Sequence, residues 1–79
     1  MYKKLDQLES GKWYYSLAPE NDLSPEASAL YVIEDTENGY TVRKFAGDCF
    51  ATTDDFIQAQ HEAEKDFQNR GWQINPFVL

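Results

Sequence analysis

The dipeptide Asn38-Gly39 lies between two runs that are rich in β-branched and aromatic residues, within the segment ALYVIEDTENGYTVRKFAG at residues 29–47. Asn and Gly both tolerate the positive φ angles of a type I′ turn, so this pattern predicts a β-hairpin with a two-residue loop. In the register that such a loop sets, Glu34 lies opposite Arg43. The sequence therefore predicts an antiparallel hairpin with a cross-strand ion pair at the solvent end of one face.

Both faces of this predicted hairpin are apolar. Because side chains alternate along a strand, Leu30, Val32 and Phe45 share one face. The solvated side of an antiparallel sheet is usually polar, and a single helix covers only one side. The second apolar face of the hairpin therefore needs another cover. The side chains expected on the face opposite Val32 are Tyr31, Ile33, Tyr40 and Val42.

The stretch GKWYYS raises the same question in a second strand, predicted at residues 12–18. If Trp13 and Tyr15 point into the core, Tyr14 stands on the opposite face. We expect that face to be covered by a partner protein, a second copy or the chain's own residues 77–79, and not by the main helix. The expected neighbours of Tyr14 there are some of Tyr31, Ile33, Tyr40 and Val42.

An amphipathic helix is predicted between a threonine cap, Thr52 or Thr53, and a glycine stop at Gly71. Asp54 and Asp55 then fall in its first turn, where the helix dipole favours negative charge. The apolar stripe that we expect to pack on the strands comprises Phe56, Ala59, Ala63 and Phe67.

Three carboxylates, Asp55, Glu62 and Asp66, fall in a narrow band on one flank of this helix. Glu62 and Asp66 are four residues apart, and such a like-charge pair costs a few tenths of a kcal/mol, about 0.2–0.5. Two interpretations stay open. The band is either a solvated helix face in an acidic protein or a stripe that binds a partner.

The remaining segments complete the predicted fold. Residues 5–8 form one helical turn or an irregular segment, residues 19–28 an exposed loop, residues 49–51 a short strand and residues 72–79 an edge strand. The fold class is α+β: a small, mainly antiparallel sheet of about four strands with one main amphipathic helix, in the order β-β-β-(β)-α-β.

Charge limits the classes of partner. Fourteen Asp and Glu against seven Lys and Arg give the 79 residues a net charge of −7, which disfavours direct binding to nucleic acid or to anionic membranes and favours a basic protein. A length of 79 residues fits a single domain, 1–79.

The N-terminus lacks the apolar run of a signal peptide, and no stretch approaches the roughly 20 apolar residues of a membrane span. We expect a cytoplasmic protein.

Catalytic and cofactor motifs are sparse. One cysteine, Cys49, and one histidine, His61, cannot supply a structural zinc site, and the carboxylates lack the spacing of a calcium loop. His61 falls near the polar side of the predicted helix, and no motif places a nucleophile beside it. The four glycines are scattered, so no phosphate-binding loop is expected. The sequence predicts a protein that is not an enzyme and has no cofactor.

The run YVIEDTENGYTVRKFAGDCFATTDDFIQAQHEAEK, followed by GWQINP, resembles the partial RNase-H-like module of HicB-type antitoxins. In that module a hairpin, a third strand near a Gly-x-Cys-like turn, a helix and a Pro-ended strand follow one another. The aromatic N-terminal strand and the lack of an appended DNA-binding segment depart from that family. The resemblance implies a module that masks a basic, RNA-cleaving toxin.

Two functions follow from these patterns. The first is a non-catalytic binding or inhibitory protein that presents acidic and aromatic surface to a basic partner, such as an antitoxin, an immunity protein or a phage-type inhibitor of a nucleic-acid-binding protein. The alternative is a homo-oligomeric structural or accessory module, such as a homodimer, whose spare sheet face is covered by a copy of itself. The predicted partner-binding residues are Tyr14, Tyr31, Tyr40, Asp55, Glu62 and Asp66.

Overall fold

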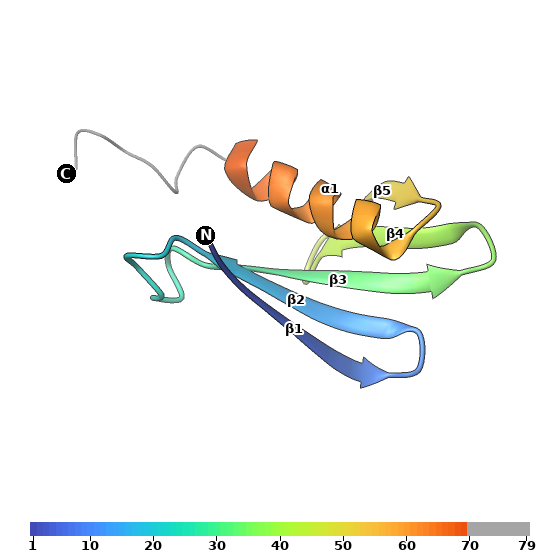
Figure 1. The fold of residues 1–79 in the computed structure, drawn as a ribbon, viewed down its shortest axis with the longest axis horizontal. Helices are drawn as coiled ribbons and strands as arrows, with labels where there is room; N and C mark the ends of the chain where they lie inside the picture. The colour runs from blue at the N-terminus through green and yellow to red at the C-terminus, as the bar shows by residue number, and fades with distance from the viewer. Residues whose placement is uncertain (70–79) are drawn as a thin grey trace.

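The computed structural model describes residues 1–69, which form five strands followed by one helix (Figure 1). The strands lie side by side in chain order, each antiparallel to its neighbours. The α+β class is confirmed, but the described order is β-β-β-β-β-α; the strand predicted at residues 72–79 lies outside the described residues. The elements are β1 (Tyr2–Glu9), β2 (Lys12–Ala18), β3 (Ala29–Thr36), β4 (Gly39–Lys44), β5 (Cys49–Thr53) and α1 (Phe56–Asn69).

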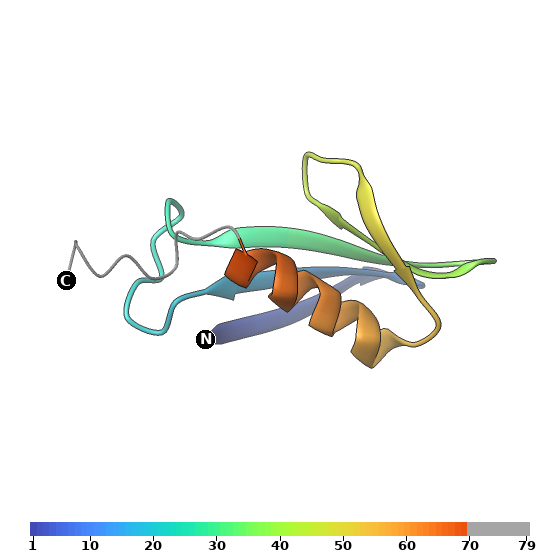
Figure 2. The ribbon, with the colours of Figure 1, turned by 90° about the horizontal axis from the view of Figure 1, so that it is seen from above.

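Helix α1 packs across one side of the sheet, over strands β2 to β5 (Figures 1 and 2). We call this side the helix-covered face and the other side the open sheet face. Ala59 and Ala63 are fully buried and bring the helix close to the strands, while Phe67 is a fully buried ring at its C-terminal end. The predicted apolar stripe is thus confirmed, with Phe56 partly buried at its margin. The sheet residues of this core are Tyr15, Leu17, Ala29, Tyr31, Ile33 and Val42.

The N-terminal segment is a strand, so the helical turn or irregular segment predicted at residues 5–8 is wrong. Ser10 and Gly11 form a loop that leads into β2, with Glu9 opposite Lys12. Gly11 has a φ of 78°, a conformation that residues with a side chain rarely adopt. This glycine therefore turns the β1–β2 hairpin. Pairing with the backbone groups of β2 favours a strand over a marginal helical turn.

The β3–β4 hairpin has a register two residues away from the predicted one. Thr36 pairs with Gly39, so the loop consists of Glu37 and Asn38. Gly39 has a φ of 115°, and a Cβ there would lie 2.3 Å from the carbonyl oxygen of Thr53 in β5. Close approach of β5 therefore requires glycine at this position. Because the shift is even, every side chain keeps its predicted face.

The predicted ion pair between Glu34 and Arg43 is wrong for the same reason. Arg43 lies opposite Val32, and Glu34 lies opposite Thr41. The Arg43 guanidinium instead donates a hydrogen bond from Nη1 to the carbonyl oxygen of Phe45, at 2.7 Å. This bond uses the cation to satisfy the backbone where β4 ends.

Asp55 is the N-cap of α1. Its Oδ1 accepts a hydrogen bond from the backbone N of Gln58 at 2.7 Å, which satisfies one of the free donors of the first helical turn. The predicted caps, Thr52 and Thr53, belong to β5, which extends two residues beyond the short strand expected at residues 49–51.

Candidate protein-binding surfaces

Tyr31 and Asp66 join the sheet to the helix. Tyr31 is fully buried on the helix-covered face, and its hydroxyl donates a hydrogen bond to Asp66 Oδ2 at 2.6 Å. Lys44 Nζ lies 3.9 Å from the same carboxylate oxygen. Burial leaves the Tyr31 ring no surface for a partner, and the Asp66 carboxylate already has a structural use. The structure thus gives both predicted partner-binding residues a packing role.

A second tyrosine makes an equivalent link on the other flank of α1. The Tyr15 hydroxyl donates a hydrogen bond to Glu64 Oε2 at 2.5 Å, and Lys3 Nζ lies 3.3 Å from Glu64 Oε1. Burial, followed by the hydrogen bond and the charge of Glu64, raises the pKa of the Tyr15 phenol well above its ordinary value. Sequence reasoning missed this pair. The usable signal was that Glu64 and Asp66 directly border the apolar stripe of the helix.

The three carboxylates of the predicted helix flank do not act as one stripe. Asp55 caps the helix, and Asp66 accepts the Tyr31 hydroxyl. Glu62 is half-buried and lines a shallow hollow together with Phe50 and Lys65. Two of these three carboxylates, Asp55 and Asp66, therefore help to hold the helix in place.

Tyr40 belongs to a cluster of three aromatic rings, which we call the aromatic cluster: Trp13, Tyr40 and Phe56. The Trp13 and Phe56 ring centroids lie 4.5 Å apart, and the Tyr40 and Phe56 centroids 5.5 Å apart. All three rings are only half-buried, at the margin of the core next to the start of α1. Paired rings of this kind hold each other in place and still present part of their area to a partner.

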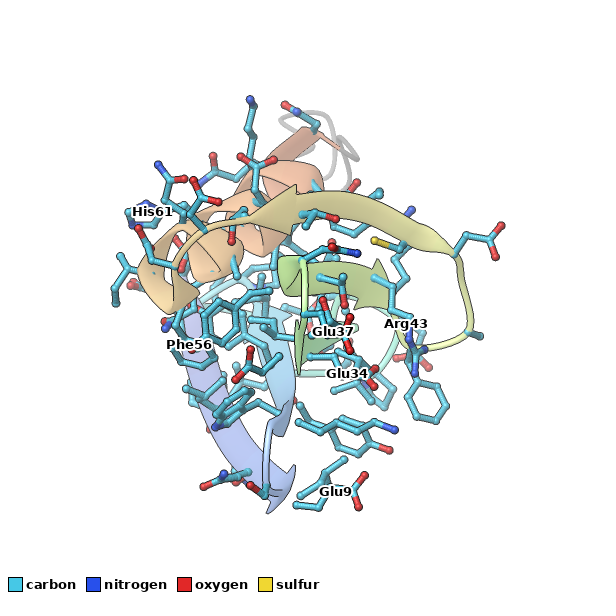
Figure 3. The ribbon with its side chains drawn as sticks, turned by 90° about the vertical axis from the view of Figure 1, so that its right-hand side faces the viewer. Glu9, Glu34, Glu37, Arg43, Phe56 and His61 are labelled. Atoms are coloured by element: carbon cyan, nitrogen blue, oxygen red, sulfur yellow. The ribbon has the colours of Figure 1, made fainter. Side chains whose placement is uncertain are left out.

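Six carboxylates surround the end of the molecule at which this cluster lies. The β1–β2 loop, the β3–β4 loop and the β5–α1 connection all meet there, and we call this region the hairpin end (Figure 1). The β1–β2 loop is joined to the end of β3 by a hydrogen bond from Asp35 N to the carbonyl oxygen of Gly11, at 2.8 Å. Figure 3 looks onto this end, with Phe56 on one side and Glu9, Glu34 and Glu37 on the other. The carboxylates are Glu9, Glu34, Asp35, Glu37, Asp54 and Asp55.

Tyr14 lies on the open sheet face, so the expectation that the main helix does not cover it is confirmed. Its ring and the Phe45 ring form a T-shaped pair at a centroid distance of 5.7 Å, and Phe45 is 52% exposed. Between them Val32 is buried, and Leu30 is half-buried. The neighbours predicted for Tyr14 are wrong, because its partner across the strands is Val32; the helix-covered face holds Tyr31, Ile33, Tyr40 and Val42.

Groups for metal or nucleophilic chemistry are few within residues 1–69. No three His, Cys, Asp or Glu side chains gather there as metal ligands. Cys49 is exposed, and its Sγ donates to the carbonyl oxygen of Ala51 at 3.2 Å. His61 is exposed on α1 (Figure 3). The only helix in this part of the chain is neither long nor apolar enough to cross a membrane.

No protein family, curated protein or solved structure matches this chain in sequence or fold comparisons. The resemblance to HicB-type antitoxins therefore rests on the residues that suggested it.

Proposed function

We propose that this protein is a non-catalytic binding module that holds a basic segment of a partner protein at its hairpin end. The observation that supports the proposal is the half-buried aromatic cluster beside the carboxylates of the hairpin end. Of the residues predicted from sequence to bind a partner, Tyr40 and Asp55 lie in this region. The proposed contact surface comprises Trp13, Tyr40, Phe56, Asp35, Glu37 and Asp54.

The chemistry of this surface suits Arg and Lys side chains. A guanidinium or ammonium group can lie against the face of a Trp or Tyr ring, where the attraction is worth about 0.5–2 kcal/mol, depending on how far the pair is desolvated. The neighbouring carboxylates Asp35 and Asp54 are exposed and can pair with further cations. Trp and Tyr also anchor many protein interfaces, because they bury a large area at a small entropic cost.

The partner class follows from charge. Proteins that bind nucleic acids expose Lys and Arg along the surface that contacts phosphates, and a net charge of −7 attracts such surfaces over a distance. A domain that covers this basic surface inhibits its partner by competing with nucleic acid. An antitoxin, an immunity protein or a phage-type inhibitor acts in this way, in the cytoplasm.

A titration with an arginine-rich synthetic peptide, followed by NMR, tests the proposal. We expect the largest shift changes at the indole N–H of Trp13 and the backbone amides of Asp35 and Tyr40. Replacing Glu37 and Asp54 by Lys should weaken binding about tenfold. The matched control, Glu26→Lys with Asp48→Lys, changes the net charge equally at exposed positions outside the hairpin end. Equal weakening by both pairs would reduce the binding to non-specific charge attraction and overturn the proposal.

The alternative, a homo-oligomeric accessory module, is supported by a different observation. Tyr14, Leu30 and the half-exposed Phe45 form an apolar strip on the open sheet face. Burying one such side chain against a second copy stabilises association by roughly 1.5–3 kcal/mol. Replacing Phe45 by Glu would then weaken association through this face without disturbing the hairpin end, and sedimentation equilibrium measures that change.

A further inference from the structure

Strand β1 forms an edge of the sheet and is exposed along its whole length. Within residues 1–69 it pairs only with β2, and all eight of its residues are exposed. Such an edge presents a row of backbone N–H and C=O groups that another strand can pair with. The opposite edge, β5, is only five residues long, so it is a shorter template than the eight residues of β1.

The charges along β1 change sign from one end to the other. Lys3 and Lys4 lie in its first half, and Asp6 and Glu9 lie in its second half. Lysines on an edge strand usually prevent pairing, since a second copy would bring like charges together. In an antiparallel copy of β1, however, the basic half of one strand faces the acidic half of the other. We propose that β1 pairs with β1 of a second copy of this chain, about a two-fold axis at Leu5.

The axis position follows from the alternation of side chains. In a sheet that continues through both copies, opposite residues share a face, so the axis falls on one residue of β1. An axis at Lys4 would place two lysines opposite each other, and an axis at Asp6 would place two aspartates together. An axis at Leu5 places each Lys4 opposite the Asp6 of the other copy. Lys4 Nζ and Asp6 Oδ2 lie 3.8 Å apart within one strand, so both side chains already point to the same face.

The same register buries the exposed apolar side chains of β1. Leu5, which is 39% exposed, then lies beside its own copy across the axis. Tyr2, at 43% exposed, comes opposite Leu8, at 47% exposed, which is the residue where the register of β1 with β2 shifts. Pairing therefore satisfies backbone groups, matches charges and covers three apolar side chains. This interface is separate from the hairpin-end contacts of Trp13, Tyr40 and Phe56 and does not depend on them.

A charge-swap experiment tests the pairing. Asp6→Lys and Lys4→Asp each place like charges opposite one another twice in the proposed dimer, so each variant should dimerise about tenfold more weakly in sedimentation equilibrium. Mixing the two variants restores both opposite-charge contacts between copies, and the mixture should form heterodimers as tight as the wild-type dimer. This mixture does not restore the contact within either strand, so rescue reports on pairing between copies. A wild-type protein that is monomeric at every accessible concentration overturns the proposal.

Cysteine cross-linking tests the register. In a Cys49→Ser background, Leu5→Cys places two thiols opposite each other across the axis, where the Cα atoms of paired strands are about 4.5–5.5 Å apart and a disulfide can form. Gln7→Cys, on the same strand and face, is the matched control, because its copy lies opposite Lys3. We expect covalent dimers of the Leu5→Cys variant and none of the control under mild oxidation. Equal cross-linking at both positions contradicts this register.

Discussion

The Tyr15 hydroxyl and the Glu64 carboxylate meet across the interface between the sheet and the helix, at 2.5 Å. The phenol comes from the second strand and the carboxylate from the second half of the helix, so the bond fixes the rotation of α1 over the sheet. We expect Tyr15→Phe to lower the free energy of unfolding by about 1.5–3 kcal/mol, the range for a hydrogen bond to a charged group. Urea denaturation measures the change, with Tyr2→Phe at an exposed position as the control. An unchanged midpoint would show that the bond adds nothing to stability.

The same tyrosine gives stability a dependence on alkaline pH. Its folded-state pKa is raised above the ordinary tyrosine value of 10.0, so the folded state holds the phenol proton more tightly than the unfolded state does. This contribution is fully present below pH 10.0 and is lost as the pH rises above that value. Urea midpoints across this range should therefore fall more steeply for the wild type than for Tyr15→Phe. Parallel pH curves for the two proteins would contradict the expectation.

The two helix carboxylates Glu62 and Asp66 should respond differently to substitution. Both line the same shallow surface hollow, but Asp66 also accepts the hydroxyl of the buried Tyr31. Asp66→Ala should destabilise the fold by about 1–3 kcal/mol, because it removes a partner of a buried polar group. Glu62→Ala should change stability by less than about 0.5 kcal/mol. Equal effects in thermal denaturation would mean that the Tyr31 bond is not specific.

Phe67 should be the most costly helix side chain to truncate. It is fully buried in the core, and Phe67→Ala should destabilise the protein by about 3–5 kcal/mol, a large part of the stability of a small domain. Ile57 is 59% exposed on the same helix, so Ile57→Ala is the control and should have little effect. Circular dichroism during urea titration compares the two. A small effect at Phe67 would show that the helix does not pack as described.

Gly39 should tolerate alanine less well than Gly11. Both have positive φ, at 115° and 78°, but a Cβ on Gly39 would lie 2.3 Å from the Thr53 carbonyl oxygen, while one on Gly11 would meet Asp35 Cβ at 3.6 Å. Gly11→Ala carries only the backbone cost, about 1 kcal/mol, and Gly39→Ala adds displacement of β5. Thermal denaturation of the pair separates the two causes. A smaller loss for Gly39→Ala would exclude the steric contribution.

Side-chain alternation and helical spacing predicted the parts of the fold that depend on local pattern. The hairpin faces and the stripe containing Ala63 and Phe67 were assigned correctly, because each depends only on period. The hairpin register was predicted wrongly, because the position of Gly39 is set by β5, which follows later in the chain. Strand β1 was missed because its conformation depends on pairing with β2 rather than on its own residues.

Only part of the candidate site could likewise be predicted from the sequence. Tyr40 and Asp55 were predicted from sequence as partner-binding residues, and the structure places both at the hairpin end. The burial of Tyr31 and its bond to Asp66 could not be predicted, because both require the helix to be positioned over the sheet. The aromatic cluster was missed for the same reason: Trp13 and Phe56 are far apart in the chain and meet only in the folded protein.

The order of the elements along the chain has a consequence for biosynthesis. Every strand pairs with the strand made just before it, so the sheet can assemble step by step as the polypeptide leaves the ribosome. The helix that covers the sheet is made afterwards, and Phe67 lies in its last turn. During that interval the nascent sheet exposes Leu17 and Ile33 to solvent, together with an unprotected β1 edge. Slow translation through the helix codons should therefore lower the yield of soluble protein, and faster codons there should raise it.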